Sequence, residues 1–297
     1  MTVHKPVLLR EALEIFNPQP GQVYIDGTIN GGGHASAIAE RIGEDGRLLG
    51  IDWDCGLIER LERKDQEDGI RNRTLVCANY ADMAAIAEDA GVSEANGVLL
   101  DLGFSSYHTD VSGRGFSFLK DEPLDMRYCA ETGHETAADI VNTRSQKELE
   151  QIFRAYGEER FARRIARGIA DARKKRPIIR TFELVELIKK NVGQPFRAGR
   201  VHPATRVFQG LRIAVNHELD NLRRGLDGAI PLLAKGGILA VISFHSLEDR
   251  IVKQFFRESE KRGGYYSPTK KPIVASDQEI KDNPRSRSAK LRVLCNI

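Results

Sequence analysis

Short apolar runs alternate with amphipathic stretches along the first hundred residues. The runs have the aliphatic, β-branched or aromatic composition of buried strands, and we expect strands at residues 23–25, 47–52, 74–77 and 97–101. The stretches between them repeat apolar residues with a helical period, and we expect helices at residues 35–42, 55–64 and 81–91. Strands that alternate with helices predict an α/β fold with a parallel sheet.

The alternation stops after residue 106. Apolar residues at a period of 3.6 then predict helices at residues 137–142, 147–156, 159–173 and 182–190. The α/β pattern resumes with a long helix at residues 211–233 and a strand at 238–243. The sequence therefore predicts a discontinuous α/β domain of residues 1–106 and 211–297, into which a mainly helical domain of residues 107–210 is inserted.

Composition and length are those of a soluble globular protein. The 297 residues are enough for two domains, with 41% hydrophobic and 29% charged residues. No apolar run approaches the length of a membrane span, and residues 1–6 lack the apolar core of a signal peptide. The four cysteines are scattered without a Cys-x-x-Cys pair, which favours a reducing cytoplasm and argues against a structural zinc site.

Charge is distributed unevenly along the chain. The net charge is only +3, but residues 144–212 contain 18 Lys and Arg against 7 Asp and Glu, a net charge of +11. The remaining residues carry a net charge of −8. A basic block beside a mildly acidic body favours a polyanionic partner. The alternative is a solvated helix surface.

A glycine-rich loop follows the first predicted strand. Gly27 and the run Gly31–Gly33 let the backbone approach a ligand, and the next helix offers free N–H groups at its N-terminus. This order is typical of the start of an α/β nucleotide-binding unit. The spacing is not that of a P-loop, nor the dinucleotide pattern G-x-G-x-x-G, which disfavours a nicotinamide enzyme. A tight turn without a ligand is the alternative.

Acidic residues end three of the predicted strands. Asp26, Asp52 and Asp101 should meet at one edge of the sheet, where ligands of open α/β folds bind. Asp52 has the place from which a carboxylate accepts hydrogen bonds from the ribose hydroxyls of a nucleoside cofactor. Asp54 competes for this role, and helix capping is the alternative for either acid. Tyr80, after the third strand, is placed to stack on a purine or is an ordinary half-buried tyrosine.

Nine short motifs, spread over nearly the whole chain, carry a resemblance to a known family. They are His4-x-Pro-Val-Leu-Leu, Gly31-Gly-Gly-His34, Leu100-Asp-Leu-Gly, Arg114-Gly-Phe-Ser-Phe, Leu124-Asp-Met-Arg127, Tyr156-Gly-Glu-Glu-Arg160, His202-Pro-Ala-Thr-Arg206, Ser243-Phe-His-Ser-Leu-Glu-Asp-Arg250 and Asn283-Pro-Arg-Ser-Arg-Ser288. Together they resemble the bacterial family of ribosomal RNA small subunit methyltransferase H. The resemblance implies a class I S-adenosylmethionine-dependent methyltransferase fold, with a Rossmann-like sheet and an inserted helical domain. It also implies methylation of N4 of a cytosine in the decoding region of 16S rRNA, with that rRNA or the small ribosomal subunit as partner.

The resemblance also implies cofactor contacts. By position they fall on Gly32, Gly33, His34, Asp52, Tyr80, Asp101 and His108. Tyr80 stands where the family commonly has Phe, and His108 stands where it commonly has Gln. Asn30 replaces the first glycine of the loop, and Asn tolerates a positive φ better than most residues.

Methyl transfer to an exocyclic amine is helped by a group that accepts its proton. The lone pair of cytosine N4 is delocalised into the ring, and an acceptor at an N4 hydrogen localises it and stabilises the developing charge. The candidates are Asp101 or Asp125, followed by His245 and Asp249 in the turn of residues 244–250. For His245 and Asp249, helix capping and hydrogen bonds within the turn are the alternative.

Basic helices and aromatic loops are candidates for RNA contacts. The basic residues that would bind phosphates are Arg160, Arg163, Arg164, Arg167 and residues 173–176. Three phenylalanines are placed to stack on an extruded base, or pack as a small satellite core: Phe104, Phe116 and Phe118.

Two other functions fit parts of the pattern. A DNA amino-methyltransferase shares the fold, but its Asp/Asn/Ser-Pro-Pro-aromatic signature is replaced after the fourth strand by Leu102-Gly-Phe-Ser-Ser. A non-catalytic RNA-binding protein that keeps the fold is the lesser alternative, to which the departures at Asn30 and His108 give some weight.

Overall fold

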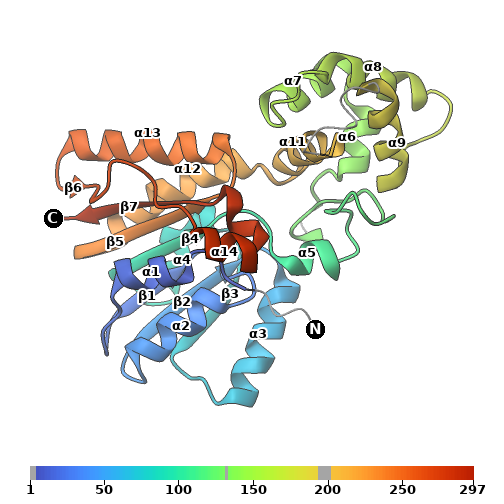
Figure 1. The fold of residues 1–297 in the computed structure, drawn as a ribbon. Helices are drawn as coiled ribbons and strands as arrows, with labels where there is room; N and C mark the ends of the chain where they lie inside the picture. The colour runs from blue at the N-terminus through green and yellow to red at the C-terminus, as the bar shows by residue number, and fades with distance from the viewer. Residues whose placement is uncertain (1–4, 131–132, 193–201) are drawn as a thin grey trace. The chain divides into compact units, whose positions relative to one another are not determined.

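The structure, a computed structural model, describes residues 5–130, 133–192 and 202–297. His4, the first residue of the first motif, lies outside the described residues. The chain forms two compact units, Met1–Ser105 with Leu219–Ile297 and Ser106–Glu218 (Figure 1). In the described part of the chain, no helix is both long enough and apolar enough to cross a membrane.

A seven-stranded sheet forms the centre of the first unit, in the order β3-β2-β1-β4-β5-β7-β6. The strands are β1 (Val23–Asp26), β2 (Arg47–Asp52), β3 (Arg73–Cys77), β4 (Ala95–Asp101), β5 (Leu233–Ser243), β6 (Tyr265–Tyr266) and β7 (Lys290–Asn296). β1 to β5 are parallel, whereas β7 runs antiparallel between β5 and β6. The strands predicted in the first hundred residues and the α/β fold are confirmed.

Helices cover both faces of this sheet (Figure 1). They are α1 (Leu9–Phe16), α2 (Gly33–Ile42), α3 (Cys55–Asp68), α4 (Met83–Asp89), α12 (Glu218–Ala229), α13 (Ser246–Arg262) and α14 (Asp277–Asp282). Successive residues of a strand point to opposite faces. Leu48 accordingly packs with residues of α1, α2 and α3, and Leu49 packs with residues of α4, α12 and α13. Because both faces are buried, the strands are continuous apolar runs, which is the pattern that predicted them.

The prediction of one long helix at residues 211–233 is wrong. The segment contains the end of α11 (Ala204–Asn216) and the whole of α12. His217 separates the two helices, because its φ of 50° lies in the left-handed region and interrupts the helical backbone. After α12, a 3₁₀ turn that contains Pro231 leads into β5. This strand begins at Leu233 rather than at residue 238.

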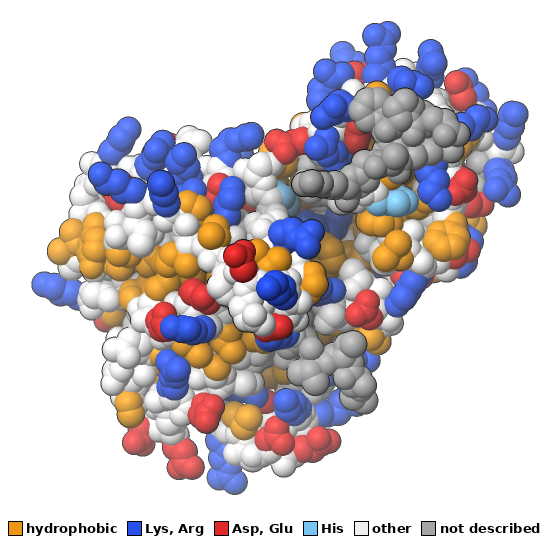
Figure 2. Space-filling view, in the orientation of Figure 1, with side chains coloured by type: hydrophobic (Ala, Val, Ile, Leu, Met, Phe, Trp, Pro, Cys, Tyr) orange, Lys and Arg blue, Asp and Glu red, His pale blue; other side chains and the backbone are white. Residues whose placement is uncertain are grey.

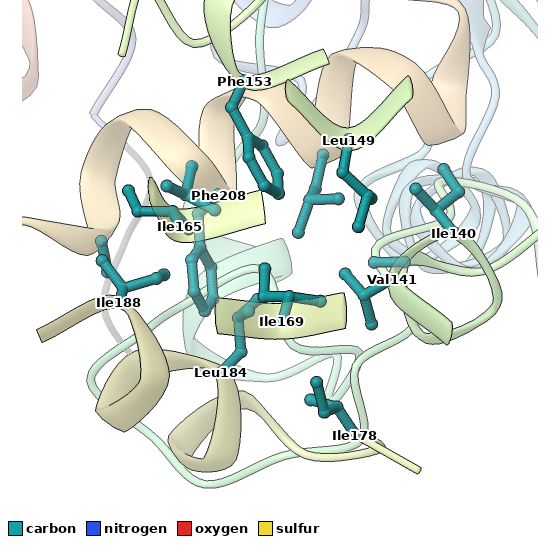
Figure 3. Packing of buried hydrophobic residues seen from close by; sticks show 14 of the residues in the cluster. Ile140, Val141, Leu149, Phe153, Ile165, Ile169, Ile178, Leu184, Ile188 and Phe208 are labelled. Atoms are coloured by element: carbon teal, nitrogen blue, oxygen red, sulfur yellow. The ribbon is translucent and has the colours of Figure 1, made fainter. Parts of the chain in front are cut away.

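The second unit is built from helices around one apolar core (Figure 3). Its helices are α5 (Ser106–Asp110), α6 (Ala137–Thr143), α7 (Gln146–Ala155), α8 (Ala162–Ala172), α9 (Thr181–Val192) and α11. Thr136 and Ser145 start α6 and α7 with capping boxes, in which side chain and backbone exchange hydrogen bonds. Phe153 of α7, Ile169 of α8 and Leu184 of α9 are fully buried in the core.

Two of the four cysteines are bonded to each other. Cys55, the first residue of α3, and Cys77, the last residue of β3, form a disulfide with their Cα atoms 5.0 Å apart. The scattered cysteines favoured a reducing cytoplasm in the sequence analysis, and their spacing did not predict this bond. The sequence separation of 22 residues hides the pairing, because only the alignment of β2 with β3 brings the two residues together.

Replacing Phe153 by Ala should lower the free energy of unfolding by about 3–5 kcal/mol, because the ring is fully buried in the core of the second unit. Arg154→Ala is the matched control. Arg154 is exposed and pairs with Glu150 one turn earlier on the same helix, so its loss should cost less than about 1 kcal/mol. Urea unfolding followed by circular dichroism measures both. Equal losses in the two variants would contradict the packing.

Candidate active site

Three buried acids end neighbouring strands at one edge of the sheet of the first unit. Asp26, Asp52 and Asp101 are the last residues of β1, β2 and β4, which lie side by side and run parallel. Their exposed fractions are only 2%, 9% and 5%. The predicted meeting of the three acids at one edge is confirmed, and it places a concentration of carboxyl groups beside the glycine-rich loop.

The loop between β1 and α2 is fixed by its own backbone and by Asn30. Asn30 adopts a φ of 49°, so it takes up the left-handed conformation expected of it in place of glycine. Its N–H donates to Oδ2 of Asp52 at 2.8 Å, and its side-chain amide donates to the carbonyl groups of Thr28 and Asp101. Asn30 thus ties the loop to the ends of β2 and β4.

Gly32 and Gly33, the two glycines predicted to contact the cofactor, must be glycine for different structural reasons. Gly32 has a φ of 74°, which side chains rarely tolerate. A Cβ at Gly33 would lie 2.9 Å from Cγ of Pro6, so close packing against the N-terminal segment requires glycine there. Gly33 therefore supports the loop by packing, and its contact with a cofactor stays a prediction.

Asp52 and Asp54, the two candidates for the ribose contact, have different structural roles at the start of α3. Oδ1 of Asp54 accepts a hydrogen bond from the Gly56 N–H, so Asp54 is the N-cap of this helix. Oδ1 of Asp52 accepts from the Asp54 N–H at 2.9 Å. Asp52 is therefore a strand-end acid held in place by two backbone donors, and it keeps the position predicted for a ribose contact.

Asp101 and His34 lie together inside the edge. Nδ1 of His34 is 3.6 Å from Oδ2 of Asp101, and Nε2 of His34 lies 3.0 Å from the Val7 carbonyl. Oδ1 of Asp101 is buried, and no hydrogen bond reaches it from residues 5–130, 133–192 or 202–297. A buried carboxyl oxygen without a partner is costly, so this atom is suited to a donor or a cation supplied from outside the chain.

Burial raises the pKa of two of the acids, Asp26 and Asp101. Burial raises the pKa of Asp26 to about 7, against the lowering effect of the hydrogen bond from the Thr28 N–H, and Asp52 raises it further. Burial likewise raises the pKa of Asp101 well above its usual value, and the charges of Asp26 and Glu248 add to the effect. Sequence reasoning missed Glu248, because no pattern shows that α13 brings it near Asp101. The edge therefore favours positive charge in a ligand.

Tyr80 and His108 are the two remaining cofactor candidates. Tyr80 begins a 3₁₀ turn after β3 and is half-buried, and a Cβ at Gly225 would lie 2.5 Å from its ring. His108 belongs to the second unit, where its ring packs against Phe116 and Tyr128 with centroids 5.0 and 5.1 Å away. Their contacts with a cofactor stay predictions.

The aromatic loop residues pack within the second unit. Phe116 is buried and stacks on Tyr128, with centroids 5.4 Å apart. Phe118 stacks on His202 at 4.6 Å and meets the edge of Phe208. Both phenylalanines therefore pack against other rings, which was the alternative to base stacking.

Asp125 forms an ion pair with Arg127, two residues later in the same loop. Nε and Nη2 of Arg127 donate to its two oxygens at 2.7 and 2.8 Å, and the Arg127 N–H donates to Oδ1 as well. This pairing shapes the loop around Met126, whose φ is 65°. Asp125 has a structural role in the second unit that the sequence did not indicate.

His245 and Asp249 hold the start of α13. Nδ1 of His245 accepts from the Glu248 N–H in a capping box, so the capping alternative for His245 is confirmed. Asp249 instead pairs with Lys290 and Arg292 of β7, at 2.9 and 2.7 Å. Burial raises the pKa of Asp249, but these two cations outweigh it and leave the pKa below its usual value. Both side chains thus have a structural task at the start of this helix.

The strand order, the antiparallel β7 and the glycine loop after β1 define a class I methyltransferase fold. The family described as the MraW methylase family matches residues 1–297, and the chain belongs to that family. Three curated relatives named ribosomal RNA small subunit methyltransferase H show how close the likeness is. The protein of Syntrophotalea carbinolica is 47% identical, and the match covers 98% of this chain and 97% of the relative.

The other two relatives are similar over their whole length as well. The protein of Deinococcus deserti is 48% identical, with 98% of this chain and 92% of the relative covered. The protein of Persephonella marina is 46% identical, with both chains covered completely. The resemblance seen in the sequence motifs is therefore confirmed, and S-adenosylmethionine is the cofactor.

The residues at the edge fit this cofactor. S-adenosylmethionine carries a positively charged sulfonium and an ammonium group, together with a ribose that has two hydroxyl groups. The acids of β1, β2 and β4 can supply negative charge for the sulfonium and the ammonium group. Oδ1 of Asp101 is a buried acceptor without a partner in the described residues. The donor set is thus chemically suited to a cationic nucleoside.

The raised pKa of Asp26 predicts a pH dependence of stability. In the fold its pKa is about 7 instead of 3.8, so the folded chain holds the proton more tightly, and stability from this group is lost as pH rises through that window. Asp26→Asn keeps an acceptor for the Thr28 N–H and cannot ionise. Its stability relative to the wild type should therefore rise by about 2–3 kcal/mol between pH 5 and pH 8.

Urea unfolding at the two pH values measures this difference, and Asp89→Asn, at an exposed position, is the control. A stability difference between Asp26→Asn and the wild type that is the same at pH 5 and pH 8 would contradict the account of Asp26.

Proposed function

We propose that this protein transfers a methyl group from S-adenosylmethionine to the exocyclic N4 of a cytosine in the decoding region of 16S rRNA. The observation that carries the chemistry is the buried Oδ1 of Asp101, an acceptor at the ligand edge of the sheet that the described chain leaves without a hydrogen bond. The rRNA substrate is supported by the names of the curated relatives.

The residues of the first unit have separate tasks in this proposal. Asp52 accepts hydrogen bonds from the ribose hydroxyl groups, and the ring of Tyr80 stacks on the purine. Gly32, Gly33 and His34 bring backbone and the start of α2 against the cofactor. S-adenosylmethionine supplies the methyl group on a sulfonium. The main contribution of these contacts is alignment, because holding reactants in line supplies on the order of 7–11 kcal/mol.

Asp101 is the proton acceptor that we favour. As a carboxylate it binds an N4 hydrogen at Oδ1 and takes the proton as the new N–C bond forms. Its raised pKa makes the ionised form a stronger base than an ordinary carboxylate. His34, 3.6 Å from Oδ2, orients the carboxyl group. Asp125, His245 and Asp249 are second choices, because each already has a structural partner.

The second unit supplies a cationic surface for RNA. Figure 2 shows Lys and Arg side chains gathered over its helices. Arg163, Arg164 and Arg167 are exposed on α8, whereas Arg173 is half-buried and donates to the Val141 carbonyl, which gives it a structural role. A groove of about 950 Å³ between α8 and α9 has an exposed aromatic ring, Phe182, and charged residues of both signs in its lining: Arg167, Lys175, Arg176 and Lys190 with Asp171, Glu183 and Glu186. The cations and the ring are the features of this groove that a single-stranded nucleic acid would bind.

The first unit has a cationic face of its own on α13. Arg250, Lys253, Arg257 and Lys261 are exposed and spaced three or four residues apart, so they share one side of the helix. Figure 2 shows blue side chains gathered along this helix. In this proposal, the basic residues of α13 make a second set of contacts with phosphate groups of the RNA.

Asp101→Asn should lower turnover at saturating cofactor about 10²–10⁴-fold, because a neutral amide cannot accept the proton. His245→Asn is the matched variant, since Asn keeps the helix cap and removes the imidazole. It should keep most of the turnover. Transfer of labelled methyl groups to small subunits that lack the modification, with the base mapped by mass spectrometry, measures both. Full turnover in Asp101→Asn would remove Asp101 from the mechanism.

Arg167→Glu and Lys175→Glu should weaken RNA binding and make the dependence of log Kd on log salt shallower, by about one for each phosphate group that the variant no longer binds. Lys64→Glu, on the exposed side of α3, is the control with the same charge change. Fluorescence anisotropy with rRNA fragments at several salt concentrations gives the slopes. A slope that is unchanged in the groove variants would place the RNA elsewhere.

A further inference from the structure

The Cys55–Cys77 disulfide lies at the ligand edge of the sheet. Cys77 is the residue of β3 that pairs with Asp52 of β2, and the next residue, Ala78, donates its N–H to the Asp52 carbonyl. Cys55 follows the N-cap Asp54 directly and is the first residue of α3. The bond therefore joins the segment that follows Asp52 in the chain, the acid that we assign to the ribose, to the end of the neighbouring strand.

Two short turns are tied together by this bond. On one side, the Asp54 N–H donates to Asp52, and Asp54 caps α3. On the other side, Oδ1 of Asn79 accepts from the Ala81 N–H and starts the 3₁₀ turn that carries Tyr80. These are the turns that hold the proposed ribose and purine contacts, so a covalent link between them fixes the two contacts relative to each other.

The Cys55–Cys77 disulfide is accessible to thiols in solution. Cys77 is exposed and Cys55 is half-buried, whereas Cys295 is a buried thiol of β7. Thiol–disulfide exchange needs access to one of the two sulfur atoms, and exposure of Cys77 provides it. Exposed disulfides are the labile ones, and regulatory disulfides are among them.

We infer that Cys55 and Cys77 form a reversible redox modification site that sets the affinity of the S-adenosylmethionine pocket. Oxidation removes two protons and two electrons from the two thiols and forms the S–S bond. A low-molecular-weight disulfide such as oxidised glutathione takes up both and leaves as two thiols. The oxidised form binds the cofactor more tightly, because the bond holds both turns in place before binding and so lowers the cost of ordering them.

This inference rests on the proposed assignment of Asp52 and Tyr80, and calorimetry with the full chain separates the two. S-adenosylmethionine is titrated into protein oxidised with oxidised glutathione and into protein reduced with dithiothreitol. Alkylation and mass spectrometry count the thiols in each sample. We expect two thiols fewer after oxidation and a Kd about 3–10-fold lower than in the reduced sample. Reoxidation should restore the lower Kd.

Matched variants identify the cysteines responsible. The double variant Cys55→Ser with Cys77→Ser should have the Kd of the reduced wild type and ignore dithiothreitol, while Cys129→Ser should respond as the wild type does. If Cys55 and Cys77 stay thiols under oxidation, or if Kd differs less than twofold between the two states, the redox inference falls and the cofactor assignment stands. If the cofactor binds in neither state, both fall.

Discussion

The burial of carboxyl groups at the ends of three neighbouring strands is the constraint on which the active site depends. A buried acid is tolerated only when donors or cations meet it, and otherwise it holds its proton. Here the loop supplies some of the donors, from Thr28 and Asn30, but one oxygen of Asp101 stays without a partner in the described residues. The site is thus prepared for a ligand that brings positive charge and hydrogen-bond donors.

The chain buries acids at the edge of the sheet and exposes cations on the surfaces of its helices. The first unit concentrates acids in its interior edge, which suits a cationic methyl donor, whereas the second unit exposes cations on its helices, which suits the phosphates of RNA. Two aromatic rings that were candidates for base stacking, Phe116 and Phe118, pack against other rings of the second unit.

The sequence predicted what depends on local pattern. Continuous apolar runs predicted the parallel strands, and an acid at each strand end predicted the edge. It favoured Asp52 over Asp54 for the ribose contact, but it did not separate a base from a cap at His245, because the same residue types serve both purposes. The break at His217 was missed because a left-handed residue leaves the apolar period intact, and the bond of Cys77 was missed because it depends on strand alignment.

Titration of ¹³C-labelled aspartate carboxyl groups by NMR tests the central claim most directly, with Asp26→Asn and Asp101→Asn to assign the signals. Without cofactor, both carboxyl groups should titrate well above the usual range for aspartate, Asp26 near pH 7. With S-adenosylmethionine bound, both should be ionised at neutral pH, because the cation favours the charged form. Ordinary titration of both groups, or raised values that do not respond to the cofactor, would contradict the account.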